Sequence, residues 1–239
     1  MNLRQKIGKA FDPDFVRYVT QRGQAILRRS ITVEQVLAQV DQENLAALKT
    51  KYFRAEEKVQ PPKYLNEEEW VRKNLRRARD CGLTPAPPKR RVLDLGCGVG
   101  WFLLVARALG HDAHGLDLEG HPIYREMTAL LGIPRTIHEI KPYERLPAEI
   151  QGYDLVSAYM TCFNRYPDGG EWSPKEWRFF LDDLEARLNP GATICLELNP
   201  RADGTPIAGD VRSWFEERGA RVIFGRILFP PERRTRPVR

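Results

Sequence analysis

Apolar residues follow a helical spacing through the first third of the chain. Between residues 33 and 52 they recur three and four positions apart, and Thr32-Val-Glu-Gln35 is a capping-box sequence that begins a helix. Pro61-Pro62 interrupts the pattern, and Asn66-x-x-Glu69 begins another helix after it. The front of the chain is therefore predicted to be helical.

From residue 89 onward, short apolar runs alternate with helical patterns. The runs predict strands at residues 91–95, 113–118, 136–140, 153–158, 193–198, 222–224 and 227–229. Helices are predicted between them at residues 101–109, 122–131, 174–188 and 210–218. Strands that alternate with helices at this spacing form a mainly parallel sheet covered on both faces. We therefore predict an α/β fold with a seven-stranded sheet that ends in an antiparallel edge hairpin.

The stiff linker Pro85-Ala-Pro-Pro88 divides the chain. We predict a helical N-terminal segment over residues 1–88, an α/β domain over residues 89–232 and a loose basic tail over residues 233–239. From its position we expect the helical segment to form a lid, with Tyr64 and Trp70 reaching inward.

Charge is distributed unevenly along the chain. Residues 1–91 contain 20 Lys and Arg against 11 Asp and Glu, whereas residues 92–239 contain 18 against 21. A basic front end raises the alternative of a nucleic-acid partner. A solvated helical surface explains it more simply, because no aromatic interleaving or nucleic-acid-binding module accompanies the charge.

The cysteines and the apolar runs exclude several classes of protein. Cys81, Cys97, Cys162 and Cys195 form no CxxC pair and have no His at ligand spacing, so free thiols are expected and neither disulfides nor a metal site. No apolar run reaches the roughly 18 residues that a membrane span needs, and no signal-peptide core opens the chain. We therefore expect a cytoplasmic protein.

The most informative stretch is Val92-Leu-Asp-Leu-Gly-Cys-Gly-Val-Gly100, between a predicted strand and a helix, where open α/β sheets bind ligands. A dinucleotide-binding turn needs a small residue at the sixth position of its glycine motif, and this chain has Trp101 there. Asp94 would repel a pyrophosphate but attract the ammonium group of S-adenosylmethionine (SAM), which contains no phosphate. Charge therefore favours SAM over NAD.

Asp117 ends the next predicted strand. An acid at this place accepts hydrogen bonds from both hydroxyls of a ribose. NAD and SAM both contain a ribose, so Asp117 supports a nucleoside cofactor without choosing between the two.

These segments resemble the motifs of class I SAM-dependent methyltransferases. Val92–Gly100 resembles the first motif, Gly115-Leu-Asp117 the acidic second motif, Tyr153-Asp-Leu-Val156 the fourth strand, and Leu188-Asn-Pro-Gly191 the turn before strand five. The resemblance covers residues 89–229 and implies a Rossmann-like fold, SAM as the cofactor and methyl transfer as the reaction.

The resemblance also implies cofactor contacts. The glycine turn would let the backbone approach the methionine part of SAM, Asp94 would orient its amino group, Asp117 would hold the ribose, and the end of strand three would border the adenine. The expected cofactor-binding residues are Asp94, Gly96, Cys97, Gly98, Asp117, Leu118, Glu139 and Ile140.

On the acceptor side, the protein must mainly position the acceptor and exclude water, and a general base is needed only if the acceptor atom still carries a proton. The segment after the fourth strand should supply these groups, and Tyr159 and Asn164 are the predicted catalytic residues. His138 as a base is less favoured because a lone His beside a strand is usually structural. Cys162 as a nucleophile lacks the preceding proline usual in pyrimidine C5 methyltransferases.

The leading functional hypothesis is methylation of a small molecule or biosynthetic intermediate. One alternative is an RNA or DNA methyltransferase, although no Asn-Pro-Pro-Tyr type of segment follows the fourth strand. The other is a non-catalytic SAM-binding protein. The sequence predicts neither the acceptor nor the oligomeric state.

Overall fold

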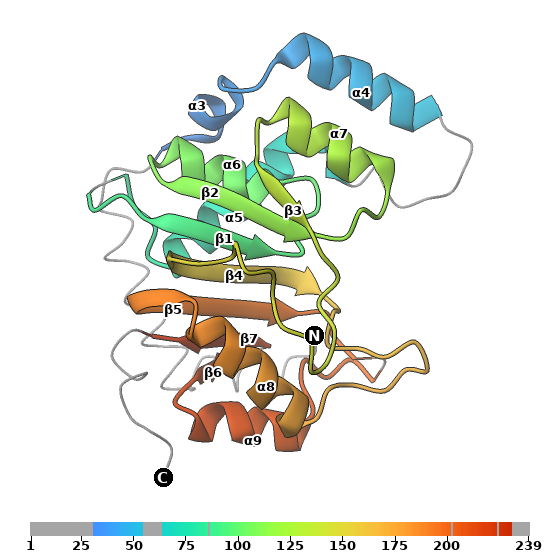
Figure 1. Cartoon of the computed structure of the whole chain (residues 1–239). Coiled ribbons are helices and arrows are strands. Elements are labelled where there is room, and N and C mark those ends of the chain that lie inside the picture. Colours follow the sequence, from blue (N-terminus) through green and yellow to red (C-terminus); the bar gives the residue numbers. More distant parts are fainter. Residues whose placement is uncertain (1–30, 55–63, 86, 202, 224, 231–239) are drawn as a thin grey trace, which may run out of the picture.

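The computed structural model describes residues 31–54, 64–85, 87–201, 203–223 and 225–230. Its centre is a seven-stranded sheet with the order β3-β2-β1-β4-β5-β7-β6 (Figure 1). The strands β1 to β5 are parallel, and β7 is antiparallel to both of its neighbours, β5 and β6. The predicted Rossmann-like α/β fold with an edge hairpin is therefore confirmed. The strands are β1 Arg91–Leu95, β2 Asp112–Asp117, β3 Arg135–Ile137, β4 Tyr153–Thr161, β5 Leu188–Leu198, β6 Arg221–Ile223 and β7 Arg226–Phe229.

Helices cover the sheet on both faces, as expected for parallel strands. One buried cluster joins the sheet to the helices α3 to α7, and the other joins it to α8 and α9 (Figure 1). The helices are α3 Val33–Leu37, α4 Gln42–Arg54, α5 Glu67–Asp80, α6 Trp101–Ala108, α7 Pro122–Leu130, α8 Pro174–Glu185 and α9 Gly209–Glu217. Among the described residues, no helix has both the length and the apolarity to cross a membrane.

The front segment begins as predicted but contains a break. Thr32 caps α3 through the capping box with Gln35, and Asn66 caps α5 by accepting a hydrogen bond from the Glu69 N–H. The apolar stripe from residue 33 to residue 52 does not form one helix, because Asp41 accepts a hydrogen bond from the Asn44 N–H and starts α4 afresh. The parts of the lid expectation that fall on residues 1–30 and 55–63, and the basic tail, lie outside the described residues.

Partly buried ion pairs connect α5 to the sheet. Arg77 Nη2 lies 3.1 Å from Glu197 Oε1 on β5, and Arg226 on β7 pairs with Glu197 at 3.1 Å and with Asp80 at 2.5 Å. The α5 helix is therefore part of the layer that covers the sheet, although it precedes the predicted domain boundary at residue 89.

Two predicted boundaries are wrong for identifiable reasons. The third strand ends at Ile137 and not at residue 140, because the chain leaves the sheet after His138 N donates its bond to Asp117 O. The fifth strand begins at Leu188, where α8 was predicted to end, and Asn189-Pro-Gly191 lies inside this strand. Gly191 has a φ of +77°, and the pairing with β4 shifts there, so the expected turn is a bulge in β5.

Candidate functional site

The glycine turn connects β1 to α6 at the carboxyl-terminal edge of the sheet. Gly96 N donates to Leu116 O at 2.7 Å, which fastens the turn to β2. Gly96 has a φ of +68°, and a Cβ added to it would lie 2.6 Å from Thr161 Cγ2. Gly98 has a φ of +53° and open space where a Cβ would be. The turn therefore needs glycine both for its conformation and for close approach to its backbone.

Cys97 supports this turn through packing. Its side chain is buried, and a Cβ added to Gly115 on β2 would lie 2.5 Å from Cys97 Sγ. Any side chain at position 115 would therefore collide with the Cys97 thiol, which explains the glycine there. Burial raises the pKa of Cys97, so this thiol is not a thiolate nucleophile.

Asp94 lies at the end of β1 and is only 3% exposed. Ser157 Oγ on the neighbouring strand β4 donates to Asp94 Oδ1 at 2.6 Å. Burial raises the pKa of Asp94 to about 7, against the opposing effects of Ser157 and Arg77. A buried carboxylate without a close cation is destabilised when it is ionised. A cationic group bound next to Asp94 would stabilise its ionised form.

Asp117 ends β2 beside the same turn. Its Oδ2 accepts from Gly98 N at 2.5 Å, and its Oδ1 accepts from Leu118 N at 2.8 Å. Burial raises the pKa of Asp117, and the two backbone N–H groups oppose that rise. Each carboxylate oxygen has a second lone pair, so the geometry leaves Asp117 able to accept two hydroxyl hydrogen bonds.

Leu118, predicted to bind the cofactor, and Glu139 and Ile140, predicted to border the adenine, lie in different environments. Leu118 follows Asp117 and is 48% exposed, so it offers an apolar surface at the sheet edge. Glu139 forms an ion pair with Lys141, and both side chains are largely exposed. Ile140 is buried in the core on the α8 side. Because β3 ends at Ile137, both Glu139 and Ile140 lie in the following loop, and Ile137 itself is 49% exposed at the strand end.

Tyr159 lies within the core between β4 and α5. Its hydroxyl is 2.8 Å from Cys81 Sγ, its ring stacks edge-on against Phe102, and the Arg77 guanidinium lies 4.3 Å from the ring centroid. Burial raises the pKa of Tyr159. This environment favours a packing role, and it does not favour direct contact with an acceptor.

Asn164 lies in the segment between β4 and α8. Its Oδ1 is buried without a hydrogen-bond partner among the described residues, as is Trp172 Nε1. Both side chains line a cavity of about 10 Å³, which is room for one water. Trp172 and Trp177 pack against each other and against Phe180 in the core. Trp172 and Trp177 are therefore core residues beneath the segment between β4 and α8.

Tyr124 on α7 is a candidate site residue that was not predicted from the sequence. Its ring packs edge-on against Tyr64 at 6.1 Å between centroids, and Tyr64 O accepts from Trp101 Nε1 at 2.8 Å. Burial raises the pKa of Tyr124, and the nearby Tyr64, Asp117 and Cys162 raise it further. Tyr64 therefore lies against Tyr124 and accepts a hydrogen bond from Trp101, the residue that follows the cofactor turn. That Tyr64 and Trp70 reach inward as part of a lid over an acceptor site stays a prediction. A lone Tyr in a helix gave no sequence signal for this contact.

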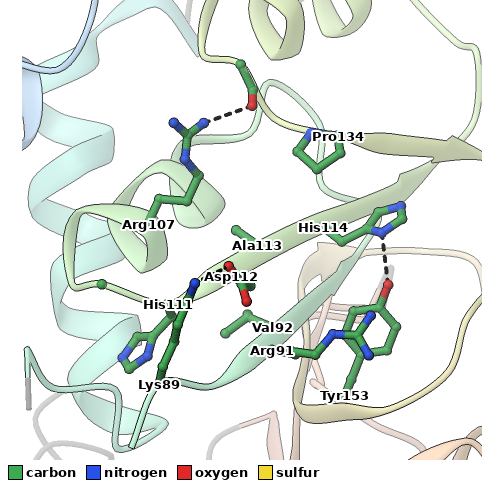
Figure 2. A pocket seen from close by; sticks show the side chains of 12 residues that line it. Lys89, Arg91, Val92, Arg107, His111, Asp112, Ala113, His114, Pro134 and Tyr153 are labelled. Atoms are coloured by element: carbon green, nitrogen blue, oxygen red, sulfur yellow. Dashed lines mark hydrogen bonds and ion pairs between the residues drawn. The ribbon is translucent and has the colours of Figure 1, made fainter. Parts of the chain in front are cut away.

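A cavity of about 640 Å³ lies at the opposite, amino-terminal edge of the sheet (Figure 2). Most of its charged and polar side chains have partners within the protein, although His111 Nε2 is buried without a hydrogen-bond partner among the described residues. Lys89 pairs with Asp112 at 2.7 Å, Arg107 donates to Leu131 O and Gly132 O, and Tyr153 Oη lies 2.9 Å from His114 Nδ1. Parallel sheets bind ligands at their carboxyl-terminal edge, so the size of this cavity does not make it the active site.

Comparison with solved structures places several methyltransferases near this fold. The glycopeptide N-methyltransferase MtfA has 16% identity and a TM-score of 0.41, over 56% of this chain and 55% of that chain. DesVI of Streptomyces venezuelae has 15% identity and a TM-score of 0.42, over 69% and 60%. CalS10 of Micromonospora echinaspora, an amino pentose methyltransferase, has 23% identity and a TM-score of 0.39, over 54% and 50%. The chain thus spans between half and two thirds of the length of these three proteins.

No curated protein matches the chain in sequence. A family model described as a methyltransferase domain matches residues 66–233, well over half of the chain. The match begins at the cap of α5, which agrees with the packing of this helix into the domain. The strand order, the glycine turn and the two carboxylates at its sides agree with this match. The chain belongs to the SAM-dependent methyltransferase family.

Proposed function

We propose that this enzyme transfers the methyl group of SAM to a small-molecule acceptor at the carboxyl-terminal ends of β1 and β4. The observation that carries the proposal is a pair of carboxylates, the buried Asp94 and the partly buried Asp117, on either side of a turn whose glycines leave backbone space. A cationic amino acid group and a ribose are the partners that these two carboxylates fit, and SAM contains both.

Each residue of the turn has a distinct role in this proposal. Asp94 holds the ammonium group, because its desolvated carboxylate gains most from a cation. Asp117 accepts the ribose hydroxyls while Gly98 N and Leu118 N keep its carboxylate in place. Leu118 and Ile137 offer apolar surface to the adenine. Ile137 suits this role better than Glu139, because Glu139 is exposed and forms an ion pair with Lys141. Ile140 supports that edge from the core.

SAM supplies a methyl group that its sulfonium has already activated. The chain therefore has to align the acceptor and keep water out. Tyr64 and Tyr124 close one side of the turn, and the end of β4 closes the other. Asn164 lies behind that end of β4 with its amide oxygen buried beside a cavity that holds no more than one water, so we propose that it supports the acceptor side through that water and does not contact the acceptor itself.

The charges of the front segment support a small acceptor over a nucleic acid. Among the described residues of this segment, four basic side chains pair with carboxylates: Lys49 with Glu67, Lys51 with Glu126, Arg72 with Glu68, and Arg77 with Glu197. Cations that are already paired release fewer counterions on binding a phosphate backbone.

The four free thiols support the expected cytoplasmic location.

A transfer assay separates the three functional hypotheses. Tritiated SAM is offered with panels of small amines, alcohols and thiols, and in parallel with transfer RNA and duplex DNA. The proposal predicts labelled small products that are lost in Asp117→Ala. Label in nucleic acid, with a steep dependence on salt, would favour the nucleic-acid alternative. SAM binding without any labelled product would favour the non-catalytic alternative.

A further inference from the structure

The strand β4 is irregular at one residue next to the cofactor turn. Tyr159 pairs with Glu197 and Thr161 pairs with Leu198, so Met160 is an extra residue without a partner on β5. Met160 has a φ of +57°, a left-handed conformation that non-glycine residues seldom adopt. Such strained residues persist where the surroundings hold them, and they gather at functional sites.

Three hydrogen bonds hold this bulge in place. Asn199 Nδ2 donates to Met160 O at 2.8 Å, and Asn199 N donates to Thr161 O at 2.9 Å. Arg165 Nη2 in turn donates to Asn199 O at 2.6 Å. The conformation of Met160 is therefore fixed by the segments after β4 and β5, and it is not the fraying end of a strand.

The bulge turns an apolar side chain outward. Met160 is 41% exposed, while Tyr159 and Thr161 on either side of it are buried. It belongs to neither of the two buried clusters that cover the sheet. Bulges commonly re-aim a side chain next to an active site.

The position of Met160 places this side chain at the crevice of the sheet. The strands β1 and β4 are neighbours, and the strand order reverses between them, which is where open α/β sheets bind their ligands. The next residue, Thr161, lies directly against Gly96 of the cofactor turn.

Other exposed apolar side chains gather at the same edge. Leu118 follows β2, Ile137 ends β3, and Tyr143 lies in the segment after β3 with a φ of +59° and 54% exposure. Tyr143 is fixed by donating from its hydroxyl to Glu176 Oε1 at 2.7 Å. An apolar surface at the mouth of a site is typical of a ligand-binding surface.

We propose that Met160 is a specificity-determining residue, the apolar wall against which an acceptor with an aromatic or aliphatic face lies during methyl transfer. This inference rests on the proposed function of the site. Met160 contributes a flexible thioether that packs well against aromatic rings, and the bulge gives it a fixed position beside the turn. Purely polar acceptors would leave this side chain in water.

Methyl NMR tests this assignment directly. The chain has three methionines, Met1, Met127 and Met160, so labelling their methyl groups with ¹³C gives at most three signals, and Met160→Gly identifies one of them. The protein is first saturated with S-adenosylhomocysteine and then titrated with benzylamine or, as a polar match, ethanolamine. We expect benzylamine to shift the Met160 signal and to bind roughly tenfold more tightly than ethanolamine.

Two variants and a control define the outcome. Met160→Gly adopts the left-handed conformation without strain, and Met160→Gln keeps the length of the side chain but is polar. Both should weaken benzylamine binding roughly tenfold and leave S-adenosylhomocysteine affinity unchanged, and Met160→Gly should not lower the melting temperature. Phe53→Ala, a change at a 61% exposed residue of α4, should alter neither ligand.

The two levels of the proposal fail in different ways. If S-adenosylhomocysteine binds but benzylamine leaves the Met160 signal unmoved, or if both variants keep benzylamine affinity, Met160 is not the acceptor wall. Equal affinity for benzylamine and ethanolamine would also show that Met160 is not the acceptor wall. If S-adenosylhomocysteine itself does not bind the folded protein, the proposed function fails and this inference fails with it.

Discussion

Both edges of the sheet contain charged and polar residues, but these residues lie in different environments at the two edges. At the amino-terminal edge, Lys89, Arg91, Arg107 and His114 surround a cavity, and each is bonded to a carboxylate, a carbonyl or a phenol (Figure 2). At the carboxyl-terminal edge, burial raises the pKa of Asp94 and Asp117, and two non-glycine residues are held in left-handed conformations.

The difference is our reason for proposing the carboxyl-terminal edge as the cofactor site, although the cavity of about 640 Å³ lies at the other edge. Groups that already have partners contribute to stability, and a ligand would have to replace those partners. Groups that are destabilised in the unliganded protein gain when a ligand of the right charge arrives. Changes at the carboxyl-terminal edge should therefore alter cofactor binding most, and changes at the amino-terminal edge should alter stability.

The largest expected effect is at Gly96. Gly96→Ala would force a Cβ against Thr161 Cγ2 in a left-handed turn, so we expect SAM affinity to fall by roughly a hundredfold or more, since about 3 kcal/mol of strain and displacement is involved. Gly110→Ala is the matched control at the other edge. Gly110 has a φ of +91° but open space around it, so this change should lower stability without weakening SAM binding. Calorimetric titration and thermal unfolding measure both, and equal SAM affinity in the two variants would contradict the comparison.

Asp94 should link cofactor binding to pH. Only the ionised carboxylate attracts the ammonium group, and the pKa of Asp94 is about 7, so SAM affinity should fall as the pH drops below 7. Because the folded pKa lies above that of the unfolded chain, the folded state binds the proton more tightly. Its stability relative to the unfolded state therefore falls as the pH rises from about 4 to about 7.

Asp94→Asn tests both consequences. The amide is never charged, so the variant should lose the pH dependence of SAM binding and bind SAM more weakly at pH 8. Without SAM, its free energy of unfolding at pH 8 should exceed that of the wild type by up to about 4 kcal/mol, with little gain at pH 4. Denaturant titrations at the two pH values provide the measurement. An equal change in stability at both would show that Asp94 is not desolvated.

Tyr153→Phe is expected to have a smaller effect, on stability alone. It removes the hydrogen bond to His114 Nδ1 at the amino-terminal edge, which should lower the free energy of unfolding by about 1 kcal/mol. SAM affinity should stay within twofold of the wild type, because the change lies at the opposite end of the strands. A loss of SAM affinity larger than the loss of stability would place this edge in the cofactor site.

Lys89→Ala should have the smallest effect. Its ion pair with Asp112 is exposed on both sides, at 62% and 58% of the side-chain surface, and such pairs contribute less than about 1 kcal/mol. Urea unfolding at low and at high salt should give nearly the same difference from the wild type. A change as large as that of Tyr153→Phe would mean that the pair orders the cavity.

The sequence predicted the fold well where the signal is local. The glycine turn, the caps at Thr32 and Asn66, and the strand that ends at Asp94-Leu95 were all readable, because capping, left-handed glycines and buried strands depend on neighbouring residues. Asp94 and Asp117 were placed beside the turn for the same reason, since each ends a strand next to it.

What was not predicted depends on contacts between distant segments. The bulge at Met160 is held by Asn199, which lies 39 positions away. The ring of Tyr124 on α7 packs against the ring of Tyr64, which lies just before α5. Tyr159 was predicted to be catalytic because it lies near the end of a strand, but the side-chain alternation of β4 points it toward Cys81 and α5. The start of β5 was missed because its register shift against β4 leaves no local pattern. The end of β3 was missed because it depends on where the chain leaves β2, after the His138 N bond to Asp117 O.

Calorimetric titration with SAM and with NAD, on the wild type and on Asp117→Ala, tests the central claim most directly. Thermal unfolding of the same samples separates loss of binding from loss of folding. Saturable SAM binding, weakened roughly tenfold or more in Asp117→Ala because hydrogen bonds to a charged group are lost, and no NAD binding, is the result that the two-carboxylate site predicts. NAD binding to the folded wild type, or SAM binding that Asp117→Ala leaves unchanged, would contradict it.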